Sequence, residues 1–391
     1  MRILFYRYGS ICEPDIIAGF RTLGHEITEI TEEIYNKQTD ARTCLTLVKN
    51  ALLSSHFDMV FSINFYPVIS EVCNIFKTIY TCWIVDCPVM ELYSYSIRNP
   101  YNRIFIFDRA CYLDFVNENP SCIFYFPLAT NVAQWDKMCS QITEKDREKF
   151  SCDISFIGSN YEEKCPYNKL DNPPAYLKGY LDGLIDAQLK IYGCNFMEEV
   201  LTDSMVEEFK KYINFYPFPE NAVHNDKAVM AQFYLNTKVA EQERLRLLRS
   251  LSERFPVDIY TFSDVSSMPK IHHRGSASTQ TEMPKIFHLS KINLNITAKP
   301  IRTGLSLRIW DVLGAGGFLI SNYQEEIPEY FEIGRDLEVY SSEEELIEKI
   351  SYYLEHESER KAIAENGYRK VKEHHSYVTR LKEMLKIISP A

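Results

Sequence analysis

The sequence predicts an α/β protein made of two doubly wound domains. Three observations lead to this fold class. The first half alternates short apolar segments with segments of helical spacing, and the same alternation begins again near residue 154. Such alternation is typical of a parallel sheet with helices on both faces. The chain has 391 residues, and because domains usually have about 100–200 residues, the length favours two.

Five short segments of the first half have the character of buried strands. Each is rich in Ile, Val or aromatic residues and ends at a polar residue or a proline. The five cover residues 2–6, 59–63, 81–85, 104–107 and 123–126. Between the first two, residues 16–23 and 44–53 repeat apolar side chains at the spacing of a helix.

The second half supplies a second set of strands and a helical end. The strands are expected at residues 154–158, 257–260, 292–296, 318–321 and 337–340. Residues 173–255 have little strand character and are expected to be helical, most clearly at 241–251. Ser342 and Glu345 fit a capping box, and further helices are expected at 358–373 and 377–388.

The domain boundary is expected in the polar segment 137–151. This places residues 1–150 in the first domain and residues 151–376 in the second.

Composition excludes several classes of protein. The formal net charge is -11 and no block of Lys and Arg is present, so nucleic-acid binding is not expected. No segment has the ~18 apolar residues of a membrane span. The 11 cysteines lie between Cys12 and Cys194 without a C-x-x-C pair. This pattern favours reduced thiols and a cytoplasmic location.

Residues 293–320 carry the clearest chemical signal, and they read as strand, loop, helix, turn and strand. Gly304 lets the loop backbone approach a ligand, and Ser306 is placed to cap the helix that follows. The backbone N–H groups of that helix suit a diphosphate. Arg308 adds a forked positive charge, and Asp311, three residues on, can accept hydrogen bonds from ribose hydroxyls.

A purely structural reading of the same residues stays open. Arg308 and Asp311 can form an i,i+3 surface ion pair, and Gly316 and Gly317 can serve only as the end of the helix.

Several motifs of the two halves form a recognisable set. In the second half they are Ser290-Lys-Ile-Asn-Leu-Asn295, Gly304-Leu305, Arg308, Asp311, Gly316-Gly317 and His375-x-Tyr377-x-x-x-Arg380. In the first half they are Asn64-Phe-Tyr-Pro67, Trp83-Ile-Val-Asp-Cys-Pro88 and Phe107-Asp-Arg109. With these motifs, residues 286–380 resemble the C-terminal domain of the bacterial CgeB-like glycosyltransferases, within the GT-B superfamily, and the first half resembles the N-terminal domain found with those proteins.

The resemblance implies a GT-B fold, in which two Rossmann-like domains face each other across a cleft. Residues 1–150 would form the acceptor-side domain, residues 377–391 a helix that packs back on it, and residues 151–376 the domain that binds the nucleotide sugar. The implied activity is that of a hexosyltransferase-type glycosyltransferase in a bacterial cytoplasm. It would move a sugar from a UDP- or dTDP-linked donor to a hydroxyl of a glycan, a protein or a small molecule, with no cofactor besides this co-substrate.

The residues expected to bind the donor lie in loops and turns of the second domain. For the turns at Gly158-Ser159 and Arg274-Gly275, a plain structural role is the alternative. The full set is Gly158, Ser159, Arg274, Gly275, Asn295, Thr303, Gly304, Leu305, Ser306, Arg308, Asp311, Gly316 and Gly317.

The sequence departs from the family pattern at one position. Many retaining GT-B enzymes have Glu-x7-Glu here, where the second Glu binds ribose and the first binds the donor sugar. Asp311 takes the second place and Thr303 the first. Ribose binding therefore carries over to Asp311, whereas the sugar contact and the stereochemical outcome stay open.

Two carboxylates of the first domain are candidate catalytic residues. Glu13 and Asp86 each follow an expected strand, and the carboxyl ends of parallel strands line ligand crevices. Either can deprotonate an acceptor hydroxyl or orient the donor sugar. The structural alternatives are a helix cap for Glu13 and a turn anchor for Asp86.

No metal is expected in the site. Neighbouring histidines, as in His272-His273 and His374-His375, diverge on a strand or a helix and make poor ligand pairs. An Asp-x-Asp motif is also missing from the sequence. Arg308 and the helix dipole are expected to balance the leaving diphosphate instead.

Two other functions compete with glycosyl transfer. A nucleotide-sugar epimerase uses the same fold but needs several ionisable groups around one sugar, and the sequence shows no such cluster. A non-catalytic GT-B-like partner subunit has no reason to retain the set of Arg308, Asp311 and Gly317.

Overall fold

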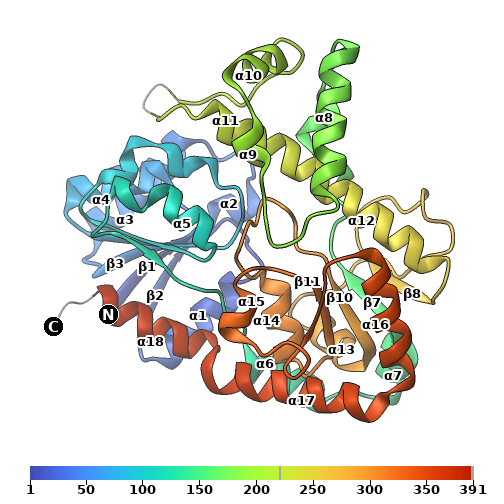
Figure 1. Cartoon of the computed structure of the whole chain (residues 1–391). Helices are drawn as coiled ribbons and strands as arrows, with labels where there is room; N and C mark the ends of the chain where they lie inside the picture. Colours follow the sequence, from blue (N-terminus) through green and yellow to red (C-terminus); the bar gives the residue numbers. More distant parts are fainter. Residues whose placement is uncertain (220–221, 389–391) are drawn as a thin grey trace. The chain divides into compact units, whose positions relative to one another are not determined.

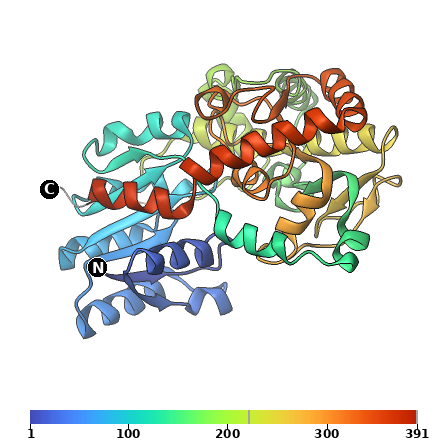
Figure 2. The same cartoon turned by 90° about the horizontal axis from the view of Figure 1, so that it is seen from below.

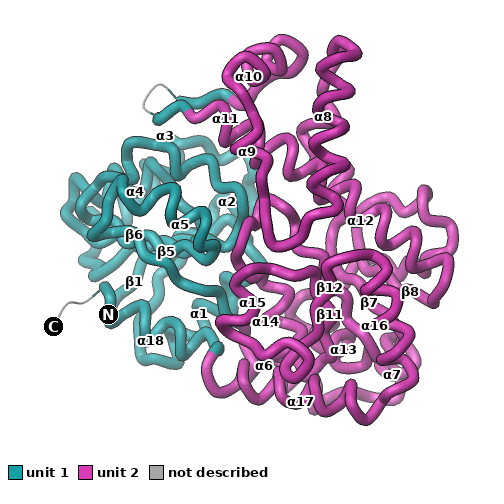
Figure 3. The backbone as a smooth tube through the Cα atoms, viewed as in Figure 1, with its two compact units in different colours: residues 1–129, 217–224, 375–391 teal, residues 130–216, 225–374 magenta. Residues whose placement is uncertain are grey.

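The computed structural model describes residues 1–219 and 222–388. Strands and helices alternate along the chain (Figure 1). They divide into two compact units, which Figure 3 shows in different colours. Unit 1 contains residues 1–129, 217–224 and 375–391, and unit 2 contains residues 130–216 and 225–374.

Unit 1 is built on a parallel six-stranded sheet with the order β2-β1-β3-β4-β5-β6. Its strands are β1 (Arg2–Tyr6), β2 (Glu26–Ile30), β3 (Met59–Ile63), β4 (Ile79–Ile84), β5 (Asn102–Ile106) and β6 (Ile123–Tyr125). Its α-helices are α1 (Glu13–Thr22), α2 (Glu32–Tyr35), α3 (Ala41–Ser54), α4 (Pro67–Phe76), α5 (Arg109–Phe115) and α18 (Tyr377–Ile388). Short 3₁₀ turns are η1 (Met90–Tyr93), η2 (Tyr95–Arg98) and η3 (Val116–Glu118).

The apolar runs of the sequence become the buried strands of this sheet. All five residues of β3 are buried, and so are the last four of β1. Strands covered on both faces need side chains that suit a dry interior, which explains their Ile, Val and aromatic content. The edge strand β2 was not expected from the sequence, because Glu26 and Glu29 interrupt its apolar residues and no residue of it is buried.

The last helix of the chain lies beside α1 in unit 1 (Figures 1 and 2). The two helices approach closely at Gly19, where an added Cβ would lie 2.7 Å from Cδ1 of Leu381. Helix α18 covers 377–388 of the expected segment 377–391, and residues 389–391 lie outside the described residues.

Unit 2 is built on a second parallel six-stranded sheet, with the order β12-β11-β10-β7-β8-β9. Its strands are β7 (Cys152–Ile157), β8 (Val257–Tyr260), β9 (His272–His273), β10 (Ser290–Asn295), β11 (Leu319–Asn322) and β12 (Glu338–Tyr340). The helices around the sheet are α6 (Val132–Ser140), α7 (Glu144–Phe150), α13 (Met283–Leu289), α14 (Leu307–Gly314), α15 (Ile327–Tyr330), α16 (Glu343–Glu355) and α17 (Glu357–His374).

The stretch 173–255 is largely helical, apart from residues 220–221, which lie outside the described residues. It contains α8 (Ala175–Gln188), α9 (Met197–Val200), α10 (Asp203–Lys210), α11 (Asp226–Ala228), the π-helix η6 (Val229–Leu235) and α12 (Asn236–Ser252). Two short 3₁₀ turns precede it, η4 (Glu162–Lys164) and η5 (Pro166–Lys169).

The compact units divide the chain differently from the expected domains. Residues 130–150, with α6 and α7, belong to unit 2, and residues 217–224 from the helical stretch belong to unit 1. Among residues 1–219 and 222–388, no helix combines the length and apolarity that a membrane crossing requires.

Candidate functional site

The carboxyl ends of β7 and β10 define the candidate site in unit 2. These neighbouring parallel strands end at Ile157 and Asn295, so the loops that follow them leave the sheet at the same edge. In open α/β sheets this is the edge at which ligands bind. The first loop carries Gly158 and Ser159, and the second leads to α14.

Arg244 connects these two loops. It lies on α12, and its two terminal nitrogens donate to the carbonyl oxygens of Ser159 and Ile296 at 2.6 Å each. Its guanidinium carbon lies 4.6 Å from the centre of the Tyr161 ring, and its buried Nε makes no hydrogen bond. Because both acceptors are neutral, the positive charge of Arg244 is not cancelled by the bonds that hold it in place.

The amino end of α14 lies in the same region, after the loop that follows β10. Ser306 is the N-cap residue, but its side chain does not bond to the helix; Oγ lies 3.5 Å from Oδ1 of Asn295 instead. The expected side-chain cap at Ser306 is therefore wrong. Without it, backbone N–H groups of the first turn are left for another partner, which at a helix N-terminus is favourably an anion.

Arg308 lies in the first turn of α14 and is largely buried. Its side chain is 20% exposed, lies 3.7 Å from Oδ2 of Asp311 and covers the ring of Phe287 at 5.1 Å. Burial lowers the pKa of Arg308, the Asp311 carboxylate opposes this effect, and the positive charge of Arg244 lowers the pKa further. Two guanidinium groups thus lie close enough to repel each other, and an anion bound there would relieve the repulsion.

Asp311 is held from the opposite side by Thr130. The Thr130 hydroxyl donates to Oδ1 of Asp311 at 2.8 Å, and Trp135 Nε1 donates to the same hydroxyl at 2.6 Å. The side chain of Asp311 is only 9% exposed. The pair Arg308–Asp311 is therefore a buried arrangement and differs from the surface ion pair that the structural reading proposed.

The loop before α14 is bonded to Glu326, a buried carboxylate that follows β11. Thr303 donates through Oγ1 to Glu326 at 2.7 Å, and the backbone N–H of Glu326 donates to the carbonyl of Thr303 at 3.2 Å. Gly304 accepts a bond from Gln324, and Leu305 is buried. Glu326 stands beside the residue that replaces the first Glu of the family pattern.

A small pocket adjoins the turn at Gly158 and Ser159. It has a volume of about 220 Å³ and is also lined by Phe262, Ser276 and Ala277. Phe262 is 93% exposed, which is unusual for an aromatic side chain in a concave surface. The backbone of Gly275 shapes the pocket by accepting the N–H of Thr261 at 2.7 Å.

Three of the expected donor-binding residues lie elsewhere in unit 2. Arg274 donates through Nε to the buried Asp258 at 2.6 Å. Gly316 and Gly317 lie after the carboxyl end of α14 and before β11, at the amino ends of the strands. An added Cβ at Gly317 would lie 2.6 Å from the carbonyl oxygen of Phe287. The structure does not bring these residues together with Arg308, and their donor contacts stay predictions.

In unit 1, the carboxylate of Glu13 forms hydrogen bonds with the backbone of the loop that precedes it. It is fully buried, accepts the N–H groups of Tyr8 at 2.9 Å and Gly9 at 3.1 Å, and forms an ion pair with Arg7 at 3.0 Å. A carboxylate with these partners positions the loop after β1.

Asp86 is the more accessible of the two carboxylates. Its Oδ2 accepts from the amide of Asn64 at 2.7 Å and from the hydroxyl of Tyr8 at 3.1 Å. Asn64 has a positive φ of 57° and accepts the backbone N–H of Val85 at 3.0 Å, so the two strand ends are fixed together. Burial, and then the charge of Asp86, raise the pKa of Tyr8, which keeps its hydroxyl a donor.

Asp86 opens onto a pocket of about 390 Å³ in unit 1. Aromatic rings and carboxylates share its walls, and no Lys or Arg is among the described residues that line it. Burial raises the pKa of Glu91, one of these carboxylates. The lining consists of Tyr8, Glu33, Asn64, Phe65, Tyr66, Asp86, Pro88, Val89 and Glu91.

Within residues 1–219 and 222–388, no three His, Cys, Asp or Glu side chains are arranged to hold a metal ion. That donor binding needs no metal stays a prediction.

Residues 235–386 match the family described as glycosyl transferase-like. No curated protein is similar enough to the chain to be matched.

Solved structures match over the whole chain at low identity. A glycosyltransferase from Rickettsia africae ESF-5 is 12% identical with a TM-score of 0.52, and the match covers 99% of this chain and 97% of that one. Anabaena HepE in complex with UDP-glucose is 11% identical with a TM-score of 0.51, and both chains are covered completely. Sucrose-phosphate synthase from Thermosynechococcus elongatus is 9% identical with a TM-score of 0.52, covering 99% and 98%.

Because the sequence identity to these structures is so low, their similarity to this chain shows the fold alone. Two parallel six-stranded sheets with their helices match GT-B glycosyltransferase structures along the full length. The chain has the GT-B fold, and the expected fold class is confirmed.

Three residues of the site were not recognised in the sequence. Arg244 lies inside a helix, where no local motif distinguishes it from other surface cations. Glu326 and Phe262 could have been found, since each follows a strand and the carboxyl ends of strands point to the ligand edge.

Proposed function

We propose that this chain is a glycosyltransferase that transfers a sugar from a nucleoside-diphosphate sugar to an acceptor hydroxyl. One observation carries the proposal: Arg244, which donates to the carbonyl of Ile296, and Arg308, in the first turn of α14, lie at the same carboxyl edge of the second sheet, where the N-cap side chain of α14 does not bond to the helix. Both arginines fall within the segment that matches the glycosyl transferase-like family. The forked donors of guanidinium groups match phosphate oxygens, and a diphosphate offers enough oxygens for both.

In this proposal the diphosphate binds between Arg308, Arg244 and the N–H groups of α14. Asp311 then orients Arg308, since its carboxylate is 3.7 Å away and is itself fixed by Thr130. The ribose contact expected for Asp311 stays a prediction. Glu326 is 1% exposed and accepts from Thr303, so it positions the loop before α14, and the contact to the donor sugar stays open.

The base of the nucleotide fits the pocket beside Gly158 and Ser159. The exposed ring of Phe262 offers a stacking surface there, and an aromatic face of this kind favours no single base strongly. The Anabaena HepE structure contains UDP-glucose, which supports a UDP-linked hexose as the first donor to test, with a dTDP-linked donor as the alternative.

The acceptor hydroxyl is proposed to meet Asp86. This carboxylate is exposed, is fixed through Oδ2 by Asn64 and Tyr8, and lines the pocket of about 390 Å³. It can therefore take a proton from a hydroxyl while retaining its position. Because rings and carboxylates line this pocket, we propose a hydroxyl-bearing glycan, protein or small molecule as the acceptor.

We also propose that the enzyme is bacterial, CgeB-like and cytoplasmic, and that it needs no metal. The described cysteines are free thiols, which supports a reducing compartment. The positive charge for the leaving diphosphate would come from Arg244, Arg308 and α14.

Turnover of UDP-glucose and dTDP-glucose by the full chain, with a chelator present and without added acceptor, tests the proposal. Slow release of UDP or dTDP together with free sugar is the expected result. Recovery of an epimerised nucleotide sugar would replace transferase by epimerase chemistry. If no nucleotide sugar is bound or turned over, the proposal fails. If turnover appears only after a divalent metal is restored, metal independence fails alone.

A further inference from the structure

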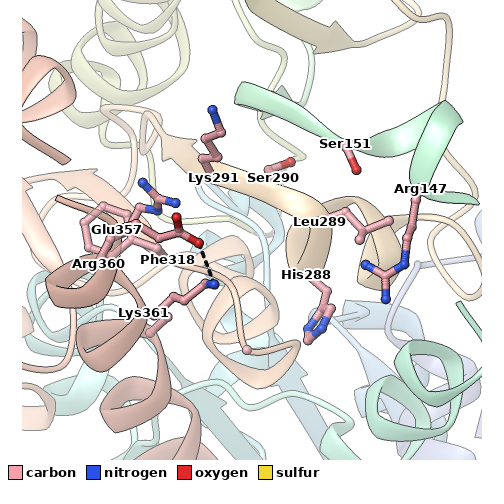
Figure 4. A pocket seen from close by; sticks show the side chains of 12 residues that line it. Arg147, Ser151, His288, Leu289, Ser290, Lys291, Phe318, Glu357, Arg360 and Lys361 are labelled. Carbon is pink, nitrogen blue, oxygen red and sulfur yellow. Dashed lines mark ion pairs between the residues drawn. The ribbon is translucent and has the colours of Figure 1, made fainter. Parts of the chain in front are cut away.

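Unit 2 contains a second pocket, at the edge of the sheet opposite the donor site. It has a volume of about 420 Å³ and lies where β10 begins and where α17 begins (Figure 4). Ser290 and Lys291 start β10, and Phe318 precedes β11. Arg308 and Arg244 lie near the carboxyl ends of the strands, whereas this pocket lies at their amino ends. The pocket is therefore separate from the donor site.

The walls of this pocket are strongly basic although the whole chain has a net charge of -11. Arg147, Lys291, Arg360 and Lys361 line it, and Glu357 is the one carboxylate among the residues that line it within the described chain. Figure 4 shows Arg147 and Lys361 entering the pocket from opposite sides. Even when Asp153, which pairs with Lys291 at 2.7 Å, is counted with Glu357, four cations against two carboxylates leave an excess of positive charge, which attracts an anion and repels cationic ligands.

Two of these cations differ in how firmly they are placed. Arg360 is 6% exposed, and its Nη1 donates to the carbonyl of Tyr353, so its guanidinium is held in the pocket wall. Arg147 is exposed and, within residues 1–219 and 222–388, has no ion-pair partner. A fixed, largely buried guanidinium and an unpaired one together offer more hydrogen-bond donors than the protein itself uses.

His288 adds a ring nitrogen that a ligand can reach. Its Nδ1 lies 3.0 Å from the carbonyl of Ala315. Because a carbonyl only accepts, Nδ1 carries the proton and Nε2 is left for another partner. Gly316 has a φ of 74°, and it leaves free the space beside this ring where an added Cβ would be in contact with Nδ1 at 3.5 Å. Phe318 and Ala364 supply an apolar wall.

The amino end of α17 also faces the pocket through Glu357, Arg360 and Lys361. Glu357 is paired with Lys361 at 2.5 Å, and Lys291 is paired with Asp153 at 2.7 Å. Among the described residues, Arg147 and Arg360 are therefore the cations of this pocket that have no carboxylate partner. The partial positive charge of a long helix at its first turn adds to the field of the side chains.

We propose that this pocket binds a small phosphorylated ligand, of the size of a sugar phosphate, at a site distinct from that of the donor. The phosphate would be held by Arg147 and Arg360, whose guanidinium groups supply forked donors for its oxygens. A volume of about 420 Å³ is within the usual range for small-molecule sites, and the apolar wall gives the remainder of the ligand a surface.

Calorimetric titration of the full chain with inorganic phosphate, glucose 6-phosphate and glucose tests this proposal. Inorganic phosphate and glucose 6-phosphate are expected to bind, and glucose is expected not to bind. Tighter binding of glucose 6-phosphate than of phosphate identifies a phosphate ester as the ligand class. Equal binding of the two identifies free phosphate as the ligand. Arg147→Glu should weaken binding by about tenfold or more, because a cation becomes an anion.

Two control variants separate this site from the rest of the molecule. Arg254→Glu makes the same change of charge at an exposed arginine outside the pocket and should leave the affinity unchanged. Arg308→Ala should also leave it unchanged, so failure of the proposed donor site would not affect the result. Absence of phosphate binding, equal loss in Arg254→Glu, or loss in Arg308→Ala would overturn the proposal.

Discussion

Asp86 and Glu13 both follow strands of the first sheet, but their surroundings give them different chemistry. Glu13 is fully buried and accepts two backbone N–H groups, so its oxygens are used within the protein. Asp86 is exposed, and both of its hydrogen bonds end on Oδ2. The second oxygen can therefore reach a substrate, which makes Asp86 the better proton acceptor.

Asp86→Asn is predicted to lower kcat for glycosyl transfer by about 10²–10⁴-fold, the usual contribution of a positioned general base. The amide oxygen can still accept from Tyr8 or Asn64, so the affinity for UDP, measured by calorimetry, should stay the same. Glu71→Gln is the matched control, because Glu71 is an exposed carboxylate of α4 that accepts from Asn99. A transfer rate in Asp86→Asn equal to that of the control would remove Asp86 from catalysis.

The sequence was informative about residues that act near their neighbours in the chain. Arg308 and Asp311 could be paired from their spacing of three, and the structure places them 3.7 Å apart. Gly316 and Gly317 were grouped with them because they are close in sequence. A helix of eight residues, however, carries the chain about 12 Å along its axis. The glycines therefore reach the opposite edge of the sheet.

At the scale of elements, the position of α14 depends on how α17 packs against it. Gly367 of α17 is at the contact: an added Cβ would lie 2.8 Å from Cδ2 of Leu313 and 2.3 Å from the carbonyl oxygen of Asp336. Leu313 belongs to α14, the helix whose first turn carries Arg308. Space for a hydrogen atom at Gly367 thus helps to set where the cation lies.

Gly367→Ala is predicted to destabilise the protein by about 1–3 kcal/mol, because it overfills a packed contact. Alanine is otherwise the better helix former, by about 1 kcal/mol. Gly183→Ala in α8 is the matched control, since nothing lies within 4 Å of its added Cβ, and it should raise the unfolding temperature. Thermal unfolding of both variants decides the matter, and a Gly367→Ala variant as stable as Gly183→Ala would show that this contact does not position α14.

Most buried strands could be predicted from the sequence, because a strand covered on both faces needs a continuous apolar run. Segments 2–6, 59–63 and 257–260 agree with β1, β3 and β8. The edge strand β2 could not be found, since its partly exposed side chains leave no such run. Ser342 caps α16 as expected, because its hydroxyl accepts the backbone N–H of Glu345. The carboxylate of Glu345, however, accepts the backbone N–H of Ser341 rather than that of Ser342, so the capping box is incomplete.

At the scale of the whole molecule, unit 1 is assembled from three separate parts of the chain. Residues 217–224 join it through an antiparallel bridge between Ser94 and Ala222 and a ring contact between Tyr93 and Phe218. Contacts between residues so far apart in sequence leave no local pattern. The sequence therefore predicts two domains but not this exchange of segments.

Leu381→Ala is predicted to destabilise unit 1 by about 2–5 kcal/mol without changing the affinity for UDP. Leu381 is fully buried on α18 beside Gly19, so its loss leaves a cavity. All proposed donor contacts lie in unit 2. Unfolding should therefore begin at a lower temperature, while calorimetry with UDP gives the same dissociation constant as the wild type. A parallel loss of UDP affinity would mean that donor binding depends on α18.

The central claim is that Arg308 holds the diphosphate of a nucleotide sugar, and the affinity of UDP for the Arg308→Ala variant tests it most directly. A charge-assisted bond contributes about 1.5–3 kcal/mol, so the dissociation constant should rise about tenfold or more. Arg308→Lys should restore only part of the affinity, because an ammonium group cannot form the forked contact. Arg335→Ala, at an exposed arginine that also has an i,i+3 carboxylate partner, Glu332, is the control and should bind UDP like the wild type. An Arg308→Ala variant with unchanged affinity for UDP would contradict the account.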